Sequence, residues 1–174
     1  MAAISSFIEK LELTTAEPVA PLRRVGLLFV LGIAGSLLLQ PLLAVVWELM
    51  FDTSAAKDLS RHFGEQTLRG NPGIILLVAA IGPVIEEFIF RWGAFKLRLV
   101  KLGILPTILI TSVVFGAAHL HIAPVNVAFA TLLGIALGWI YARTDDIWCP
   151  IALHAGINAG ALVLMGVGVA SGRL

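Results

Sequence analysis

The sequence predicts an all-α fold, a polytopic membrane helical bundle of about five transmembrane helices around an intramembrane polar cavity. Two observations predict it. Hydrophobic residues make up 59% of the 174 residues and charged residues 13%, whereas soluble domains are about 45–50% apolar and about 25% charged. Several apolar runs also reach the length of about 20 residues that a helix needs to cross a bilayer.

The same composition excludes several classes of protein. An ordinary cytosolic enzyme or a disordered tail would carry more charge. With 12 basic and 11 acidic residues the net charge is +1, which leaves no basic surface for a nucleic acid. The single cysteine, Cys149, excludes a disulfide scaffold and a cysteine-rich zinc module.

The expected spans follow the apolar runs and their start signals. They cover residues 25–47, 72–100, 102–118, 122–142 and 147–172. Asn71-Pro72-Gly73 predicts a turn and a helix start, and Pro124 and Pro150 are expected near the starts of the last two helices. The charged stretch 52–69 is expected to be a wet or interfacial connection.

Residues 1–24 are predicted to form a cytoplasmic or interfacial tail, and residues 25–174 a single membrane-embedded domain. Orientation follows from basic residues near the span ends. With the N-terminus inside, the cytoplasmic side holds Arg23, Arg24, Lys96, Arg98, Lys101 and Arg143, and the outside holds Lys57, Arg61, Arg69 and Arg173. This count favours an N-terminus inside the cell.

Small residues recur four apart in the last two spans, at Gly134 and Gly138 and at Gly156 and Gly160. In apolar helices this spacing lets two backbones approach closely. The alternative is that these glycines are scattered by composition alone.

Three ionisable residues crowd the second span, at Glu86, Glu87 and Arg91. Unpaired, they would together cost roughly 10 kcal/mol of insertion free energy. Glu87 and Arg91 are four apart, which predicts an ion pair on one helix face. Glu86 lies about 100° round the helix and faces elsewhere. Either all three form a buried network that joins helices, or Glu86 faces the interior of the bundle.

Polar side chains also interrupt two other spans. His119 ends the third apolar run, and His154 and Asn158 lie four apart on one face of the fifth. A carboxylate can take a proton from water, and imidazole and amide groups can share that proton or stabilise an oxyanion. His62 and His121 are interpreted as ordinary polar residues.

The ordered motifs Glu86-Glu87…Arg91, Phe115…His119 and His154…Asn158 resemble those of a known family. It is the CAAX prenyl protease 2 and bacteriocin-processing (Abi) family of intramembrane glutamic proteases, and the resemblance covers about residues 72–162. It implies that Glu86 is the general base and His119 its partner in activating water. His154 and Asn158 would stabilise the oxyanion, and Glu87 and Arg91 would support them. No metal or other cofactor is implied.

The resemblance also implies a substrate at the lipid bilayer, namely a protein or peptide cut near its terminus. That terminus could be lipid-modified, a leader peptide, or a C-terminal sorting anchor of the myxosortase type. Small size and short loops favour a bacterial cytoplasmic membrane. Family members often have more membrane helices than this chain has room for. We expect the third helix to end within the bundle, with residues 121–124 lining a wet cavity.

Three alternatives stay open at this point. Glu86, His119 and His154 could be zinc ligands of a metalloprotease. Cys149 could be a nucleophile, although it lies between Trp148 and Pro150 at a helix start. The chain could also be a non-catalytic membrane protein, such as an immunity protein or a transporter in which an intramembrane glutamate relays protons.

Overall fold

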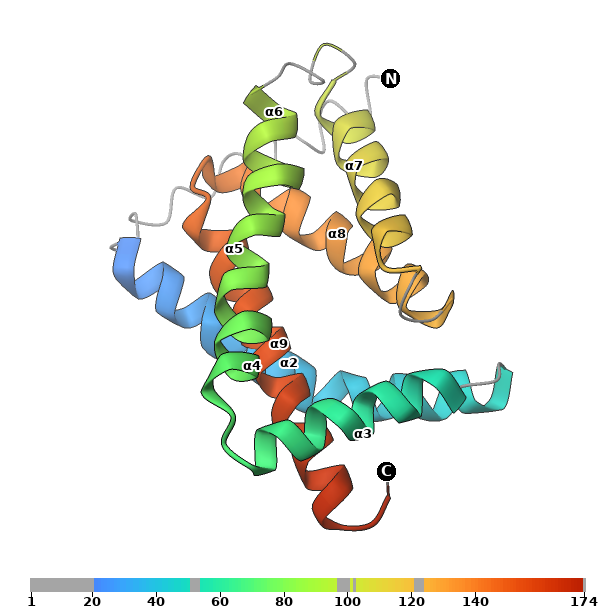
Figure 1. Ribbon diagram of the computed structural model, residues 1–174. Coiled ribbons are helices and arrows are strands. Elements are labelled where there is room, and N and C mark those ends of the chain that lie inside the picture. Colours follow the sequence, from blue (N-terminus) through green and yellow to red (C-terminus); the bar gives the residue numbers. More distant parts are fainter. Residues whose placement is uncertain (1–20, 51–53, 97–100, 102, 121–123, 174) are drawn as a thin grey trace.

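The computed structural model of the protein describes residues 21–50, 54–96, 101, 103–120 and 124–173. Every longer element within these ranges is helical (Figure 1). In chain order they are α2 (Pro21–Met50), α3 (Ser54–Leu68), α4 (Pro72–Leu76), η1 (Leu77–Ile81), α5 (Gly82–Glu87), η2 (Phe88–Gly93), α6 (Ala94–Lys96), α7 (Ile104–Ala118), α8 (Pro124–Thr144) and α9 (Trp148–Ala170). The protein is therefore an all-α helical bundle, as predicted.

The segments from α4 to α6 form one long helix, Pro72–Lys96, that contains two π-helical stretches. It begins where the sequence predicts. Asn71 caps it by accepting hydrogen bonds from the backbone N–H groups of Gly73 and Ile74, at 3.1 and 3.4 Å. Pro72 occupies the first turn, where a missing N–H costs nothing. The π-helical stretches η1 and η2 flank the six residues of α5, which end with Glu86 and Glu87.

Glycines set how closely α2 and α9 pack. A Cβ added at Gly160 would lie 2.7 Å from Ser36 Cβ, and one added at Gly156 would meet the backbone carbonyl of Phe29. Gly32 of α2 lies equally close to α9, because a Cβ added at Gly32 would lie 2.9 Å from the backbone nitrogen of Ile157. The four-residue spacing of glycines in α9 therefore allows close helix packing, and is not merely a result of the composition.

The second pair of spaced glycines lets α8 pack closely against α7 in the same way. A Cβ at Gly134 would lie 3.0 Å from Ser112 Cα, and one at Gly138 would lie 3.2 Å from a methyl carbon of Ile108. Ser112 and Ile108 are both buried, and the Ser112 hydroxyl donates to the Ile108 carbonyl at 2.6 Å. The long helix Pro72–Lys96 packs against α9 of one close pair, α2–α9, and against both helices of the other, α7–α8 (Figure 1).

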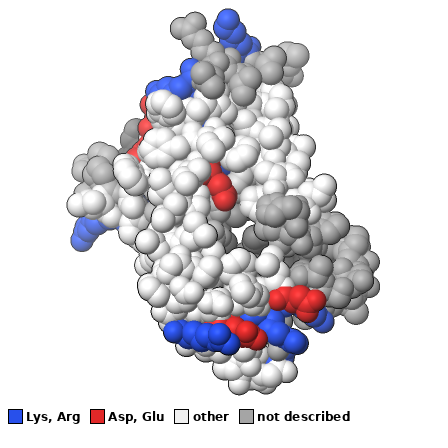
Figure 2. Space-filling view, viewed as in Figure 1, with Lys and Arg blue, Asp and Glu red and all other residues white. Residues whose placement is uncertain are grey.

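Four helices are long and apolar enough to cross a membrane: Leu22–Leu42, Pro72–Lys96, Asn126–Thr144 and Trp148–Ala170. The charged helix α3 lies across one end of the bundle (Figure 1). Figure 2 shows charged side chains gathered over α3 and at the opposite end, with a broad and mostly uncharged belt between them that carries one group of acidic atoms. The apolar length and this belt make the chain an integral, multi-pass membrane protein.

The third expected span corresponds to α7, which has only 15 residues. It ends at Ala118, as the apolar run predicts, with His119 directly after it. The expected wet lining by residues 121–124 cannot be followed, because residues 121–123 lie outside the described part of the chain. Residues 1–20 lie outside it too, so the division at residue 24 and the N-terminus inside the cell stay predictions.

We predict that Gly156→Ala lowers the unfolding temperature, because the added methyl group meets the Phe29 backbone of α2. Overpacking of this kind costs about 1–3 kcal/mol. Gly35→Ala is the matched control on α2, since nothing lies within 4 Å of a Cβ at that position. Thermal unfolding in detergent measures both. Equal unfolding temperatures would contradict the packing described for α2 and α9.

Candidate active site

The expected ion pair in the second span is confirmed. Arg91 Nε lies 3.1 Å from Glu87 Oε2, and neither side chain is exposed. Arg91 also donates from Nη2 to the backbone carbonyl of Gly134 in α8, at 3.2 Å. Because charges in a low-dielectric interior need opposite charges and hydrogen bonds, these contacts explain how a guanidinium is accommodated within a membrane helix.

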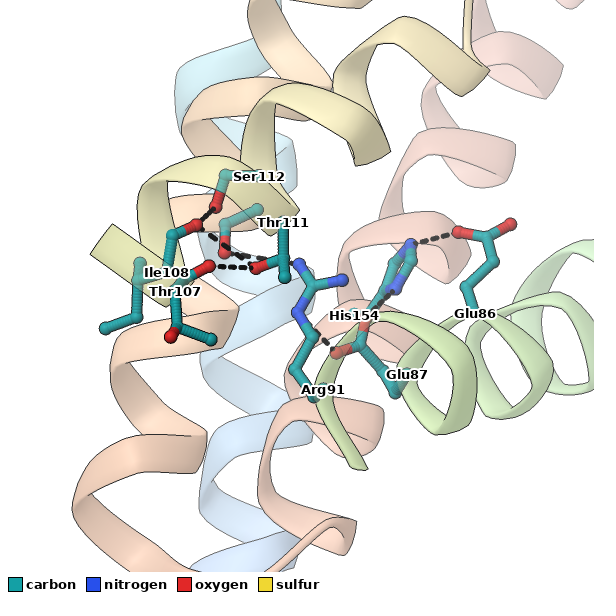
Figure 3. Close-up of polar contacts among 9 residues, drawn as sticks. Glu86, Glu87, Arg91, Thr107, Ile108, Thr111, Ser112 and His154 are labelled. Carbon is teal, nitrogen blue, oxygen red and sulfur yellow. Dashed lines mark hydrogen bonds and ion pairs between the residues drawn. The ribbon is translucent and has the colours of Figure 1, made fainter. Parts of the chain in front are cut away.

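The buried pair extends to α9 through His154. Glu87 Oε1 lies 2.9 Å from His154 Nδ1, and both side chains are buried (Figure 3). A carboxylate oxygen accepts hydrogen bonds, so this contact is a hydrogen bond that His154 donates from Nδ1 to Glu87. This contact fixes the ring orientation, and Nε2 then faces Glu86 Oε2 at 3.7 Å. The polar chain runs Arg91, Glu87, His154, Glu86.

Glu86 differs from its neighbour in exposure. Its side chain is 33% exposed, whereas that of Glu87 is completely buried. Among the described residues, Glu86 Oε2 is buried without a hydrogen-bond partner, and so are Glu87 Oε2 and the Nε and Nη1 atoms of Arg91, which form an ion pair instead. The two adjacent carboxylates therefore lie in different surroundings, one enclosed by partners and one open on one side, as their positions on the helix predict.

The Phe115 ring of α7 joins the remaining parts of the site. It is fully buried, and the Arg91 guanidinium carbon lies 4.6 Å from its centroid. The His154 ring meets it edge-on at 5.8 Å between centroids, and the His119 ring lies at 4.8 Å. His119 Nδ1 donates to the Phe115 carbonyl at 2.8 Å, which leaves Nε2 as the acceptor nitrogen of the ring.

Asn158 satisfies a backbone carbonyl that the long helix leaves free. In η1 the Gly82 N–H bonds five residues back, to the Leu77 carbonyl. In that register the next carbonyl, that of Val78, would bond Pro83, which has no N–H. Asn158 Nδ2 donates to Val78 O instead, at 2.9 Å. One amide hydrogen thus ties α9 to η1, and the amide retains a second one.

The structure therefore assembles Glu86, Glu87, Arg91 and His154 into one network. His119 joins this network through the Phe115 ring, and no hydrogen bond or ion pair links it to Glu86 in the described part of the chain. The imidazole next to Glu86 belongs to His154, whereas the resemblance implies His119 as the partner of Glu86. The chemical roles of these residues stay proposals.

Three features of the site were not predicted from the sequence. The bond between Glu87 and His154 joins residues 67 positions apart, and no local spacing signals it. Phe115 was noted only as part of a motif, although its ring contacts three site residues. The partner of Asn158 could have been suspected from Pro83 within an apolar helix, because an internal proline frees a carbonyl.

The described His, Cys, Asp and Glu side chains contain no group of three or more placed to hold a metal ion. The alternative zinc set of Glu86, His119 and His154 is therefore not assembled among them. Cys149 is fully buried, with its sulfur 3.8 Å from Asp146 Oδ2 at the start of α9.

Comparison with known proteins identifies the family. Residues 69–160 match the family model described as Type II CAAX prenyl endopeptidase Rce1-like. The chain belongs to this family. The matched range contains the whole network and both His119 and Asn158, and the resemblance seen in the three motifs is thereby confirmed.

A curated relative extends this finding. The protein named "Putative membrane peptidase YdiL" from Bacillus subtilis (strain 168) is 32% identical over 93 residues. The alignment covers 53% of this chain and 37% of that protein, so the chain spans about a third of the relative's length. No solved structure matches the chain. The family and this relative make the protein a member of a membrane protease family.

We predict that Arg91→Met lowers the free energy of unfolding by about 3–5 kcal/mol, because it leaves the buried Glu87 charge without its cation. Arg69→Met is the matched control. Arg69 pairs with Glu65 at 4.0 Å on the surface of the bundle, where such a pair contributes about 0–1 kcal/mol. Denaturant unfolding in mixed micelles measures both. A loss for Arg91→Met no larger than that for Arg69→Met would contradict the buried network.

Proposed function

We propose that this protein is an intramembrane endopeptidase of the glutamic type, in which Glu86 activates water for peptide-bond hydrolysis. One observation carries the proposal. A partly open carboxylate, Glu86, lies 3.7 Å from an imidazole nitrogen whose ring is oriented by a completely buried ion pair. Family membership supports the coarser statement that the protein is a membrane protease.

The open oxygen side of Glu86 is where a water molecule would be held. The carboxylate takes a proton from this water, and the hydroxide oxygen adds to the carbonyl carbon of the scissile peptide bond. A tetrahedral intermediate with an oxyanion results. Glu86 then transfers its proton to the leaving amine nitrogen as the carbon–nitrogen bond breaks. The carboxylate is regenerated, so no other reactant is consumed.

His154 supports this step as a hydrogen-bond donor. When it carries a proton on both nitrogens, it donates through Nδ1 to Glu87 and through Nε2 into the site beside Glu86. Glu87 plays the part of an orienting carboxylate, as the buried aspartate does in a serine protease triad. Arg91 supplies the opposite charge beside Glu87, so the carboxylate that orients His154 is itself held in place by an ion pair.

His119 and Asn158 complete the proposed site. The acceptor nitrogen of His119, fixed by its bond to the Phe115 carbonyl, would share the proton that Glu86 takes from water. The second amide hydrogen of Asn158 would reach the oxyanion, and a donor in that position is worth about 10²–10³ in rate. Asn158 then has two duties, since its other hydrogen holds Val78 of η1.

The proposed substrate is a protein or peptide already at the membrane, cut near its terminus. A lipid-modified C-terminus, a leader peptide and a C-terminal sorting anchor of the myxosortase type all fit a site that opens among membrane helices. Exposed apolar side chains of α5 and η2, such as Ile85 and Ile89, flank the site. They would let a membrane-embedded segment approach Glu86 sideways. We place the protein in a bacterial cytoplasmic membrane with its N-terminus inside.

The test compares protein termini in the membrane fraction of cells that make the native chain or Glu86→Gln. Loss of the general base lowers cleavage about 10²–10⁴-fold, so termini generated by the native protein disappear in the variant. Glu65→Gln, which changes an exposed acid on α3, is the matched control and retains them. If both variants retain the same termini at native expression levels, Glu86 is not the base.

The same assay separates the alternatives. Cys149→Ser retains cleavage under this proposal, and its loss would favour a cysteine nucleophile. Cleavage that stops with a chelator and returns with zinc would favour the metalloprotease. Membranes in which no terminus depends on the chain at all would favour a non-catalytic immunity or transport protein.

A further inference from the structure

A second polar site lies at one end of the bundle, away from Glu86. It is a cavity of about 290 Å³ where the end of α6, the end of α8 and the start of α9 meet. It is lined by Trp92, Lys96, Tyr141, Asp145, Asp146, Ile147 and Trp148. Trp148 and His154 are six residues apart on α9, about 9 Å along the helix axis. The proposed hydrolysis uses none of these lining residues.

The position of the cavity sets its depth in a membrane. Three membrane-spanning segments end or begin at it, at Lys96, Thr144 and Trp148. The ends of spans lie at the level of the lipid headgroups, where tryptophan and lysine are enriched. Trp92 and Trp148 are 46% and 56% exposed at its rim. The ligand most available at this depth is a phospholipid headgroup.

The cavity is lined by charges of both signs, and these charges do not pair with one another. Lys96 and Asp145 are exposed, and no ion pair joins them or binds either to another described residue. Asp146 is already engaged, because its Oδ1 accepts a hydrogen bond from the Trp148 N–H at the start of α9, at 3.0 Å. One free cation and one free carboxylate therefore face the same space.

Tyr141 adds an unused donor. The residue is only 3% exposed, and its ring packs edge-on against Phe95 at 5.1 Å between centroids. It lines the cavity, and among the described residues nothing forms a hydrogen bond with its hydroxyl. A hydroxyl at the wall of a cavity can donate one hydrogen bond and accept others, so Tyr141 can bond a polar ligand there.

We propose that this cavity binds the headgroup of a zwitterionic phospholipid. Lys96 and the Tyr141 hydroxyl would take the phosphate, and Asp145 would take the amine or quaternary ammonium. The two indole rings at the rim supply the aromatic faces that attract such a cation. A purely anionic headgroup would leave Asp145 facing a negative charge, and a basic substrate side chain would face Lys96.

The test is lipid retention by the full-length protein, measured by native mass spectrometry after titration with dioleoyl phosphatidylethanolamine, phosphatidylcholine or phosphatidylglycerol. We expect the native chain to retain one zwitterionic lipid in preference to phosphatidylglycerol. The double variant K96Q/D145N should bind that lipid about tenfold or more weakly. Asparagine suits position 145, because that residue has a φ of 48° and asparagine tolerates the left-handed conformation.

Two further variants sharpen the result. Tyr141→Phe removes only the hydroxyl, keeps the ring on Phe95, and should weaken retention severalfold. K57Q/D58N makes the same two charge changes on α3, at the far end of the bundle, and should leave retention unchanged. Native protein that binds phosphatidylglycerol as well as zwitterionic lipids would overturn the proposal. Equal retention by K96Q/D145N and K57Q/D58N would also overturn it.

A third outcome would overturn the proposal by assigning the cavity to another ligand. In that case K96Q/D145N retains lipid normally, but loses cleavage of substrates that have a lysine or arginine near the cut. The proposal does not depend on catalysis by Glu86, since lipid retention is measured without turnover and should persist in Glu86→Gln.

Discussion

The site depends on one arginine buried in a membrane helix. Even after relaxation, removing an ion from water costs several kcal/mol, and Arg91 recovers this only through partners supplied by other parts of the chain. Glu87 supplies the counter-charge from the same helix, Gly134 of α8 supplies a carbonyl, and Phe115 of α7 supplies an aromatic face. Three helices must therefore assemble around this guanidinium before its burial becomes favourable.

This constraint gives two adjacent carboxylates different roles. Glu87 faces Arg91 with one oxygen, in an ion pair at 3.1 Å, and His154 with the other, at 2.9 Å. Glu86, about 100° round the helix, lies 3.7 Å from the far nitrogen of the same imidazole and stays partly open. A rigid charge pair that orients a histidine beside an open carboxylate is a preorganised arrangement, since little has to move when charge develops. The π-helical stretches on either side of α5 fit this interpretation, because π-helical turns are frequent at functional sites.

Much of this architecture follows from the sequence. The apolar runs predict the spans, Asn71-Pro72 predicts the start of the long helix, and the four-residue spacing of Glu87 and Arg91 predicts their ion pair. The glycine spacings predict close packing of two helices, which the structure shows for α8 and α9. These features are local, so a periodicity of 3.6 residues and simple capping rules capture them.

The features that the sequence does not predict are tertiary contacts. The partners of His154 and Asn158 lie 67 and 80 residues away, and only the packing of α9 against the long helix brings them together. No sequence pattern marks the change to π-helical hydrogen bonding at Leu77–Ile81. This change nevertheless determines which backbone carbonyl lacks an N–H partner because of Pro83, and so which carbonyl Asn158 binds. The cavity at Tyr141 is likewise a product of three helix ends meeting, and no motif marks it.

We propose that Glu87 holds the site together and Glu86 performs its chemistry. This division is tested by the unfolding temperature of Glu87→Gln beside that of Glu86→Gln, two changes of identical size at adjacent positions. We predict that Glu87→Gln unfolds at a clearly lower temperature than the native chain, because Arg91 and His154 lose their shared anion. Glu86→Gln should unfold close to the native temperature. Equal unfolding temperatures for the two variants, or a lower one for Glu86→Gln, would contradict it.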